Sequence, residues 1–242
     1  MKVVNCTWEL ENIGKKTVEI TVEGNDTFNS NTILQCLHGY EYAVVKVPMN
    51  MPDFNVGLSE LGFACIEAQV TVGVETNNFD FCKTSHLYHD TSYQVVDDDD
   101  KLNYIVSNIT PGMFSTDRIS IDPHFGHDIG CKRYINWLTT EYRSKKSSLI
   151  RVIYKGQDVG FMLVKIEGGS IQLFLNGLYK PYQGKGLGLL TPASPLLYVK
   201  KNKLPITQEE TSISSNNIPV VKLYNRLNFN ILKQTYVFVK HY

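Results

Sequence analysis

Polar and apolar positions alternate along the first part of the chain in a way typical of short strands. Residues 53–63 (DFNVGLSELGF) instead predict a helix that Asp53 caps and Gly62 ends. Residues 75–91 are polar and aromatic without periodicity and predict a linker. The predicted strands are residues 16–24 (KTVEITVEG), 41–49 (EYAVVKVPM) and 64–74 (ACIEAQVTVGV).

The second part of the chain alternates helical and strand patterns. Closely spaced strand signals with short turns predict an antiparallel meander over residues 148–179. The predicted helices are residues 97–109, 128–146, a segment ending near 202, and 217–227. The other predicted strands are 92–96, 211–215 and a final hairpin over 228–242. The order predicts an α+β fold with a mixed, mostly antiparallel sheet flanked by helices.

A run of four aspartates, Asp97 to Asp100, raises the question of a metal site. Leu102, Ile105 and Ile109 follow at helical spacing, which places the aspartates in the first turn of a helix. Carboxylates there cap free amides and meet the positive end of the helix dipole. The run therefore predicts a helix start, and no metal site is expected from the sequence.

Composition limits the class of protein. The chain has 242 residues, 43% of them hydrophobic, and 24 basic residues balance 24 acidic ones. This balance gives no electrostatic footprint for nucleic acid, and no apolar run is long enough to span a membrane. The five cysteines are scattered, show no zinc spacing and are expected to be reduced. Reduced cysteines, together with a start that does not read as a secretory signal, indicate a cytoplasmic protein.

The stretch PYQGKGLGLLTPASPLL, residues 181–197, contains a candidate phosphate-binding loop. A Walker loop does not fit it. A Rossmann fingerprint would need glycine at position 189, where Leu189 stands, and a longer chain beyond it. The remaining pattern, Q-x-x-G-x-G, fits Gln183, Gly186 and Gly188, and its bare backbone amides suit a coenzyme A pyrophosphate.

Two motifs together resemble the GNAT superfamily of N-acetyltransferases over about residues 92–242. They are QGKGLG and, some thirty residues later, N-x-x-x-V-x-L-Y-x-x-L-x-F from Asn217. TWELENIG, LSELGFACIEAQV, DRISIDPHFG and RYINW are similar to dTDP-fucosamine acetyltransferase-like enzymes, which act on sugar-nucleotide amines. The resemblance implies a GNAT domain over 91–242 and a smaller N-terminal α/β acceptor-side domain over 1–90.

The resemblance also implies how the chain would bind acetyl-CoA. The loop would bind the pyrophosphate, and the Leu178 amide would face the developing oxyanion. Asn217 and Tyr224 lie two helical turns apart on one side of a helix, so Asn217 can contact the pantetheine while Tyr224 acts as general acid on the sulfur. A packed aromatic is the alternative for Tyr224. The loop residues are Gln183, Gly184, Lys185, Gly186, Leu187 and Gly188.

Acceptor residues are expected near the N-terminal domain. Glu67 is a candidate base, with a bulk water molecule or an outward-facing strand glutamate as the alternatives. Arg118 could bind a diphosphate as a bidentate donor, unless it forms a structural ion pair. Asp117, Asp122 and His124 from the same loop would complete the acceptor site.

The predicted activity is transfer of an acetyl group from acetyl-CoA to the amine of an amino sugar, nucleotide-linked by the resemblance. Another small amine, such as a polyamine, an amino acid or an antibiotic, is the alternative acceptor, and a polyamine would favour an acidic cleft. A non-catalytic acyl-CoA-binding module is a further alternative. The expected partner is a small molecule, with no nucleic acid, membrane or metal, and a homodimer is left open.

Two departures from the family pattern are visible. Pro192 and Pro195 interrupt the helix that should follow the loop, so the helix is expected to begin near Thr191, with Thr191 as its cap, or to bend there. Asn228 stands where the family has glycine, and asparagine tolerates the left-handed conformation.

Overall fold

The computed structural model describes residues 1–242, which form one mixed sheet of ten strands. The strand order is β1-β2-β3-β10-β4-β9-β8-β7-β6-β5. Only the pairs β2–β3 and β8–β9 are parallel. The strands are β1 Lys2–Asn5, β2 Thr17–Thr21, β3 Tyr42–Pro48, β4 Ala64–Glu75, β5 Thr91–Val95, β6 Ser148–Tyr154, β7 Gln157–Glu167, β8 Ser170–Leu178, β9 Gln208–Ser214 and β10 Asn230–His241.

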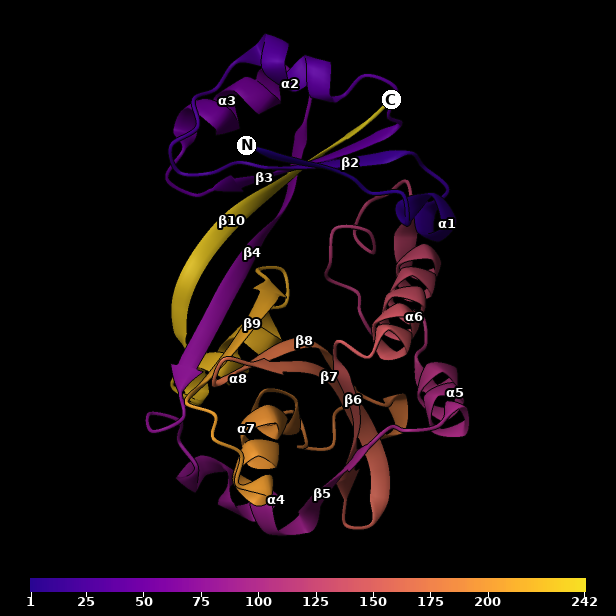
Figure 1. Ribbon diagram of the computed structural model, residues 1–242, viewed down its shortest axis with the longest axis vertical. Helices are drawn as coiled ribbons and strands as arrows, with labels where there is room; N and C mark the ends of the chain where they lie inside the picture. Colours follow the sequence, from indigo (N-terminus) through magenta and orange to yellow (C-terminus); the bar gives the residue numbers. More distant parts are fainter.

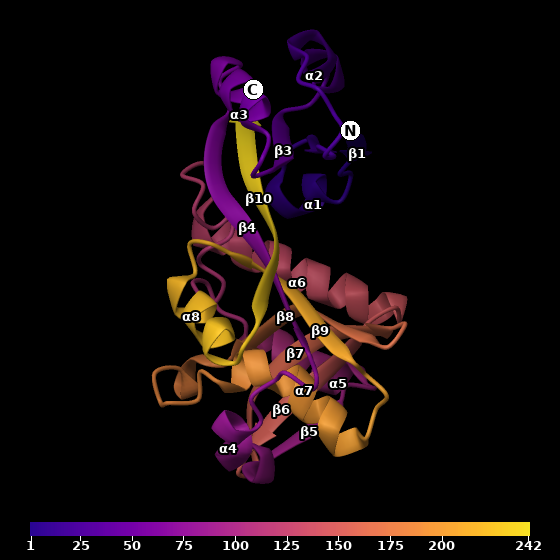
Figure 2. The ribbon, with the colours of Figure 1, turned by 90° about the vertical axis from the view of Figure 1, so that its left-hand side faces the viewer.

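Helices pack on both faces of the sheet. Figure 2 shows α6 and α8 on opposite sides of the central strands. The helices are α1 Glu9–Ile13, α2 Ser30–Cys36, α3 Pro52–Glu60, α4 Ser85–Asp90, α5 Asp99–Asn108, α6 Gly126–Ser144, α7 Leu190–Asn202 and α8 Ile218–Arg226, with short 3-10 turns at Cys82–Thr84 and Lys180–Tyr182. None of these helices combines the length and the hydropathy that a membrane span requires. The α+β class and the mostly antiparallel sheet are confirmed.

Alternating side chains of the meander divide between two cores. Met162 of β7 and Ile150 of β6 face the core beneath α4, α7 and α8. Their neighbours Phe161 and Leu149 face the core beneath α5 and α6. Successive side chains of a strand point to opposite faces, so both faces of the meander are buried and the strands contain continuous apolar runs such as residues 161–164 (FMLV).

Strand β10, the last strand of the chain, pairs with two strands from the first part of the sequence. It lies between β3 and β4, and Figure 1 shows β4 and β10 running together from the part that holds β1–β3 to the part that holds β5–β9. The predicted hairpin over 228–242 is therefore wrong. The polar residues near Lys233 are not a turn; the strand continues through a register shift between Ile231 and Lys233.

Other boundaries need smaller corrections. Met51 occupies the cap position of α3 and Pro52 begins the helix, so Asp53 lies in the first turn and is not the cap. The predicted linker contains helix α4, because Phe79 and Leu87 are buried in the large core. These apolar contacts come from distant parts of the chain and leave no periodic signal.

The acidic run behaves as predicted. Asp98 caps α5, and its carboxylate accepts a hydrogen bond of 2.8 Å from the Lys101 backbone amide. Asn228 adopts a left-handed conformation with φ of 65°, as expected for the residue after α8.

Candidate active site

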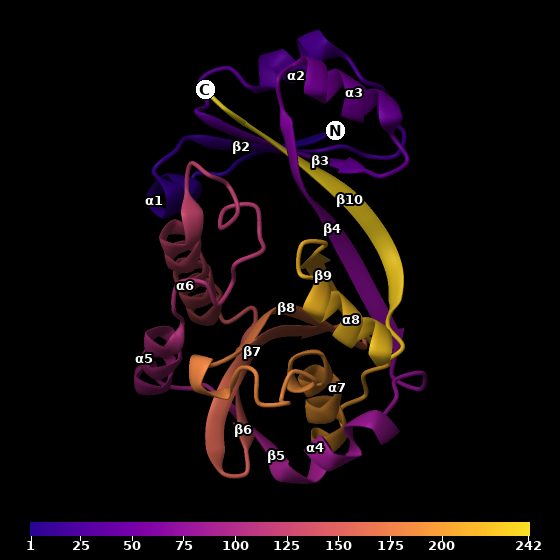
Figure 3. The same ribbon diagram turned by 180° about the vertical axis from the view of Figure 1, so that it is seen from behind.

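A cleft opens where β8 and β9 separate. These parallel strands pair only from Ser170 to Leu173 on β8, opposite Gln208 to Thr211 on β9. Beyond that point β8 stays with β7 and β9 stays with β4. Figure 3 shows α8 beside this parting of the strands. A cavity of about 1260 Å³ lies there and extends to α1 and α6.

The open edge of β8 presents unpaired backbone groups to the cleft. The Tyr179 amide donates to the Val159 carbonyl, and Leu178 is the next residue in the register, opposite Gly160. Because hydrogen-bonded and non-bonded pairs alternate in an antiparallel ladder, the N–H and C=O of Leu178 point away from β7. The carbonyl accepts a bond of 2.8 Å from the Gln183 side chain, which leaves the Leu178 amide toward the cleft.

The glycine loop keeps its amides free. None of the backbone N–H groups from Gly184 to Leu189 donates a hydrogen bond within the protein. Gly184 and Gly186 have φ values of 71° and 80°, a conformation that favours glycine. Six consecutive unpaired amides are available to an anionic group. Gln183, Gly184 and Gly188 line the cavity, while Leu187 packs against the core.

The prolines explain how the helix behind the loop begins. Helix α7 starts at Leu190, so the late start is confirmed, but Thr191 lies inside the first turn and does not cap the helix. Pro195 has no amide to donate to the Thr191 carbonyl, four residues earlier. Asn176 of β8 donates to that carbonyl instead, at 2.5 Å. The proline therefore frees a carbonyl through which the helix is bonded to the cleft wall.

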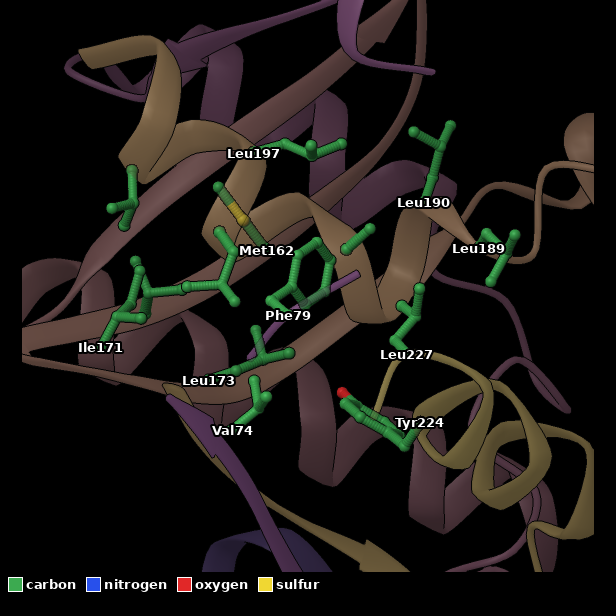
Figure 4. Packing of buried hydrophobic residues seen from close by; sticks show 14 of the residues in the cluster. Val74, Phe79, Met162, Ile171, Leu173, Leu189, Leu190, Leu197, Tyr224 and Leu227 are labelled. Atoms are coloured by element: carbon green, nitrogen blue, oxygen red, sulfur yellow. The ribbon is translucent and has the colours of Figure 1, made fainter. Parts of the chain in front are cut away.

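Asn217, at the cap of α8, and Tyr224, within that helix, both line the cavity. The Asn217 side chain also caps its helix, accepting a bond of 3.3 Å from the Val220 amide. Tyr224 is 3% exposed and lies at the edge of the large core near Leu227 (Figure 4), and its ring packs edge-on against Phe229. Burial raises the Tyr224 pKa well above its ordinary range, the Glu209 carboxyl adds to the rise, and a hydrogen bond with Thr211 opposes it. The phenol is therefore protonated at neutral pH.

Glu67 and Tyr224 line the same cavity from different elements. Glu67 comes from β4 and is 6% exposed. Burial raises its pKa, against the opposing effects of a hydrogen bond with Ser214 and the charge of Arg118. A carboxylate with a raised pKa is a better proton acceptor than an ordinary glutamate.

The two arginines of the cavity wall are already paired. Arg133 of α6 lies 2.8 Å from a Glu9 carboxylate oxygen, and Arg118 lies 3.7 Å from Glu9 and 3.8 Å from Glu19. Arg118 therefore forms the structural ion pair that was the alternative to binding a diphosphate. Asp117 also lines the cavity, but its carboxylate accepts bonds from the Ile119 amide and the Ser120 hydroxyl.

The remaining predicted residues lie outside the cavity wall. Asp122 and His124 contact each other and His241, and neither lines the cavity. Lys185 extends over the Tyr182 ring, and neither Lys185 nor Gly186 lines the cavity. The sequence analysis did not single out Asn176, Trp8 or Arg133. Asn176 falls within the predicted meander, and Trp8 and Arg133 stand in the quoted motifs TWELENIG and RYINW, but the wall formed by α1 and α6 depends on contacts between distant segments.

Comparison with known proteins identifies the fold. No family model matches the chain, and no curated protein matches it. A GCN5-related N-acetyltransferase from Sphaerobacter thermophilus superposes with a TM-score of 0.53 and 11% identity, covering 83% of this chain and 59% of that one. One from Kribbella flavida superposes with a TM-score of 0.57 and 13% identity, covering 93% and 80%.

A functionally unknown conserved protein from Staphylococcus epidermidis gives a TM-score of 0.60 at 15% identity, covering 93% of this chain and 84% of that one. A tandem GNAT protein from the clavulanic acid biosynthesis pathway gives 0.57 at 11% identity, covering 93% and 75%. The chain therefore has the fold of the GCN5-related N-acetyltransferases. At these identities the likeness concerns the fold alone.

Proposed function

We propose that this chain is an acetyl-CoA-dependent N-acetyltransferase of the GNAT superfamily. The observation that carries the proposal is the parting of β8 and β9 beside a loop with six free amides, with the protonated Tyr224 in the same cavity. Acetyl-CoA, when bound, would supply an activated thioester. Its anionic pyrophosphate fits the amides of Gly184–Leu189, and its extended amide-bearing arm fits the open edge of β8.

Residues that line the cavity can serve each step of acetyl transfer. The Leu178 amide would donate to the thioester carbonyl oxygen as negative charge develops there. Glu67 would accept the proton of the substrate ammonium, directly or through water, and so leave the amine free to attack. Tyr224 would hold the proton that the departing sulfur needs. Asn217 would orient the arm between the loop and the tyrosine.

The charge of the cavity bears on the acceptor. Five carboxylates line it and no lysine does, and its two arginines are paired with glutamates. This lining attracts the ammonium of an amino sugar, but it has no unpaired cation for a nucleotide diphosphate. We therefore retain the amino sugar as acceptor and keep the polyamine, one of the alternatives from the sequence, as the second candidate. The carboxylates are Glu11, Glu67, Asp117, Glu141 and Glu210.

Aromatic side chains support an amine acceptor at the far end of the cavity. Trp8, which precedes α1, and Trp137 of α6 both line it, and an indole face attracts a cation. Because Trp8 is exposed, this end is open to bulk water and can admit a large acceptor.

Release of free thiol from acetyl-CoA tests the proposal against a panel of nucleotide-linked amino sugars, free amino sugars and polyamines. Thiol release with any amine supports the enzyme, and the responding class identifies the acceptor. Glu210→Gln should raise the KM for a polycationic amine severalfold and leave the KM for acetyl-CoA unchanged. Binding of acetyl-CoA without thiol release on any amine would instead indicate a non-catalytic binding module.

A further inference from the structure

Three side chains with metal-binding atoms meet outside the cavity. Asp122 and His124 precede α6, and His241 ends β10. Nδ1 of His124 lies 3.0 Å from Oδ1 of Asp122, and Nε2 of His241 lies 2.8 Å from Oδ2. All three potential ligand atoms lie within 4.8 Å of one another. Two imidazoles and a carboxylate are a ligand set for Zn²⁺, whereas Ca²⁺ and Mg²⁺ prefer oxygen atoms alone.

Two of the three ligands are held in place by the fold. Asp122 is 2% exposed, and its carboxylate accepts a bond of 3.0 Å from the His124 backbone amide. The His241 ring lies 4.8 Å from the Tyr42 ring and 5.2 Å from the Phe125 ring. Tyr42 is also the cross-strand partner of His241, so β3 fixes the position of this imidazole. Such second contacts orient metal ligands before an ion arrives.

The third ligand, His124, lies at the surface, so an ion can enter the site from its side. The His124 side chain is 65% exposed, and its ring stacks on His241 at 4.0 Å. Tetrahedral zinc with bonds of about 2.0–2.1 Å separates neighbouring ligand atoms by roughly 3.3 Å. At present each imidazole nitrogen lies beside a different oxygen of Asp122, His124 at 3.0 Å from Oδ1 and His241 at 2.8 Å from Oδ2. Rotation of the exposed His124 ring out of its stack on His241 would let both nitrogens and the Asp122 carboxylate face one ion.

We propose that Asp122, His124 and His241 bind one Zn²⁺ ion, which fastens the loop before α6 to the end of β10. The same loop carries Asp117 and Arg118 to the cavity wall. The ion would therefore stabilise that part of the wall from outside the cavity. The proposal does not depend on acetyl transfer, because none of the three ligands lines the cavity. Zinc spacing is absent from the sequence because Asp122 and His241 are 119 positions apart.

Zinc competition against a chromophoric chelator tests the site on the untagged chain after removal of bound metals. The wild type is expected to bind one Zn²⁺ per chain. His124→Ala and His241→Ala should each weaken the affinity by on the order of 100-fold. His127→Ala is the matched control, because His127 is exposed and three positions away, and it should bind zinc as the wild type does.

Thermal unfolding gives a second measurement. A ligand that binds only the native state raises the Tm, so zinc should raise it in the wild type and in His127→Ala but not in His124→Ala. His124→Ala decides the question even if the His241 variant fails to fold, because the His124 side chain is exposed. The absence of stoichiometric binding, or equal affinity in His124→Ala and the wild type, would overturn the proposal and leave a hydrogen-bonded cluster.

Discussion

The side-chain amide of Asn176 donates a hydrogen bond of 2.5 Å to the backbone carbonyl of Thr191. Asn176 lies on β8 at the cleft, and Thr191 lies in the first turn of α7. This carbonyl is free because Pro195 lacks the amide that would donate to it within the helix. A residue that interrupts the helix thus creates the contact that joins the helix to the cleft wall.

Asn176→Ala is expected to lower the free energy of unfolding by about 1–2 kcal/mol, because it leaves the Thr191 carbonyl without a donor. Adding Pro195→Ala should recover part of this loss, since the new backbone amide can donate to the same carbonyl. Urea denaturation of the single and double variants measures the coupling.

Asn202→Ala is the matched control. Its side chain also donates to a carbonyl within α7, that of Tyr198, but at an exposed position. Its effect should remain within about 0.5 kcal/mol. Strictly additive effects of Asn176→Ala and Pro195→Ala would show that the Thr191 carbonyl does not link the two residues.

Gln183→Ala should weaken acetyl-CoA binding about fivefold. The substitution removes the bond to the Leu178 carbonyl that holds the glycine loop against β8, and one such bond contributes about 1 kcal/mol. Isothermal titration with acetyl-CoA measures the change. Gln208→Ala, at an exposed position on β9, should bind as the wild type does, and an equal loss in both variants would argue against a specific role for Gln183.

Glu209 should make the protein less stable as the pH rises. Its carboxyl is 1% exposed and neither oxygen has a hydrogen-bond partner, and burial raises its pKa well above the usual value. The folded state therefore retains a proton that the unfolded chain loses above about pH 4.3. Stability is fully present below that pH and decreases as the pH rises toward the folded-state pKa, by up to about 1.4 kcal/mol per pH unit.

Glu209→Gln removes this titration, so its unfolding free energy should depend less on pH between 5 and 8 than that of the wild type. Urea denaturation across that range makes the comparison. Glu210→Gln, on the opposite face of β9, should retain the wild-type dependence. Parallel pH curves for Glu209→Gln and the wild type would mean that Glu209 is already ionised in the folded protein.

The sequence predicted those parts of the fold that depend on local pattern. The antiparallel meander of β6 to β8, the cap of α5 and the late start of α7 all follow from neighbouring residues. Strand β10 was misread because its polar centre resembles a turn, and only pairing with β3 and β4 shows that the strand continues.

The cleft itself was predictable only on the side that the loop and α8 form. Gln183, Asn217 and Tyr224 stand in motifs with fixed spacing, and all three line the cavity. The acceptor side depends on pairs such as Glu9 with Arg133, 124 positions apart, which no local pattern reveals. The turn after Arg118 also directs His124 away from the cavity, although it is only six residues further along.

Steady-state thiol release from acetyl-CoA, with the responding amine and Tyr224→Phe beside the wild type, tests the central claim most directly. We expect turnover to fall on the order of 100-fold while the KM for acetyl-CoA stays nearly constant, because the phenol supplies a proton and little binding. Tyr236→Phe, which lies outside the cavity, should be fully active. Unchanged turnover in a folded Tyr224→Phe protein would contradict the role of Tyr224, and no thiol release by the wild type on any amine would contradict the activity.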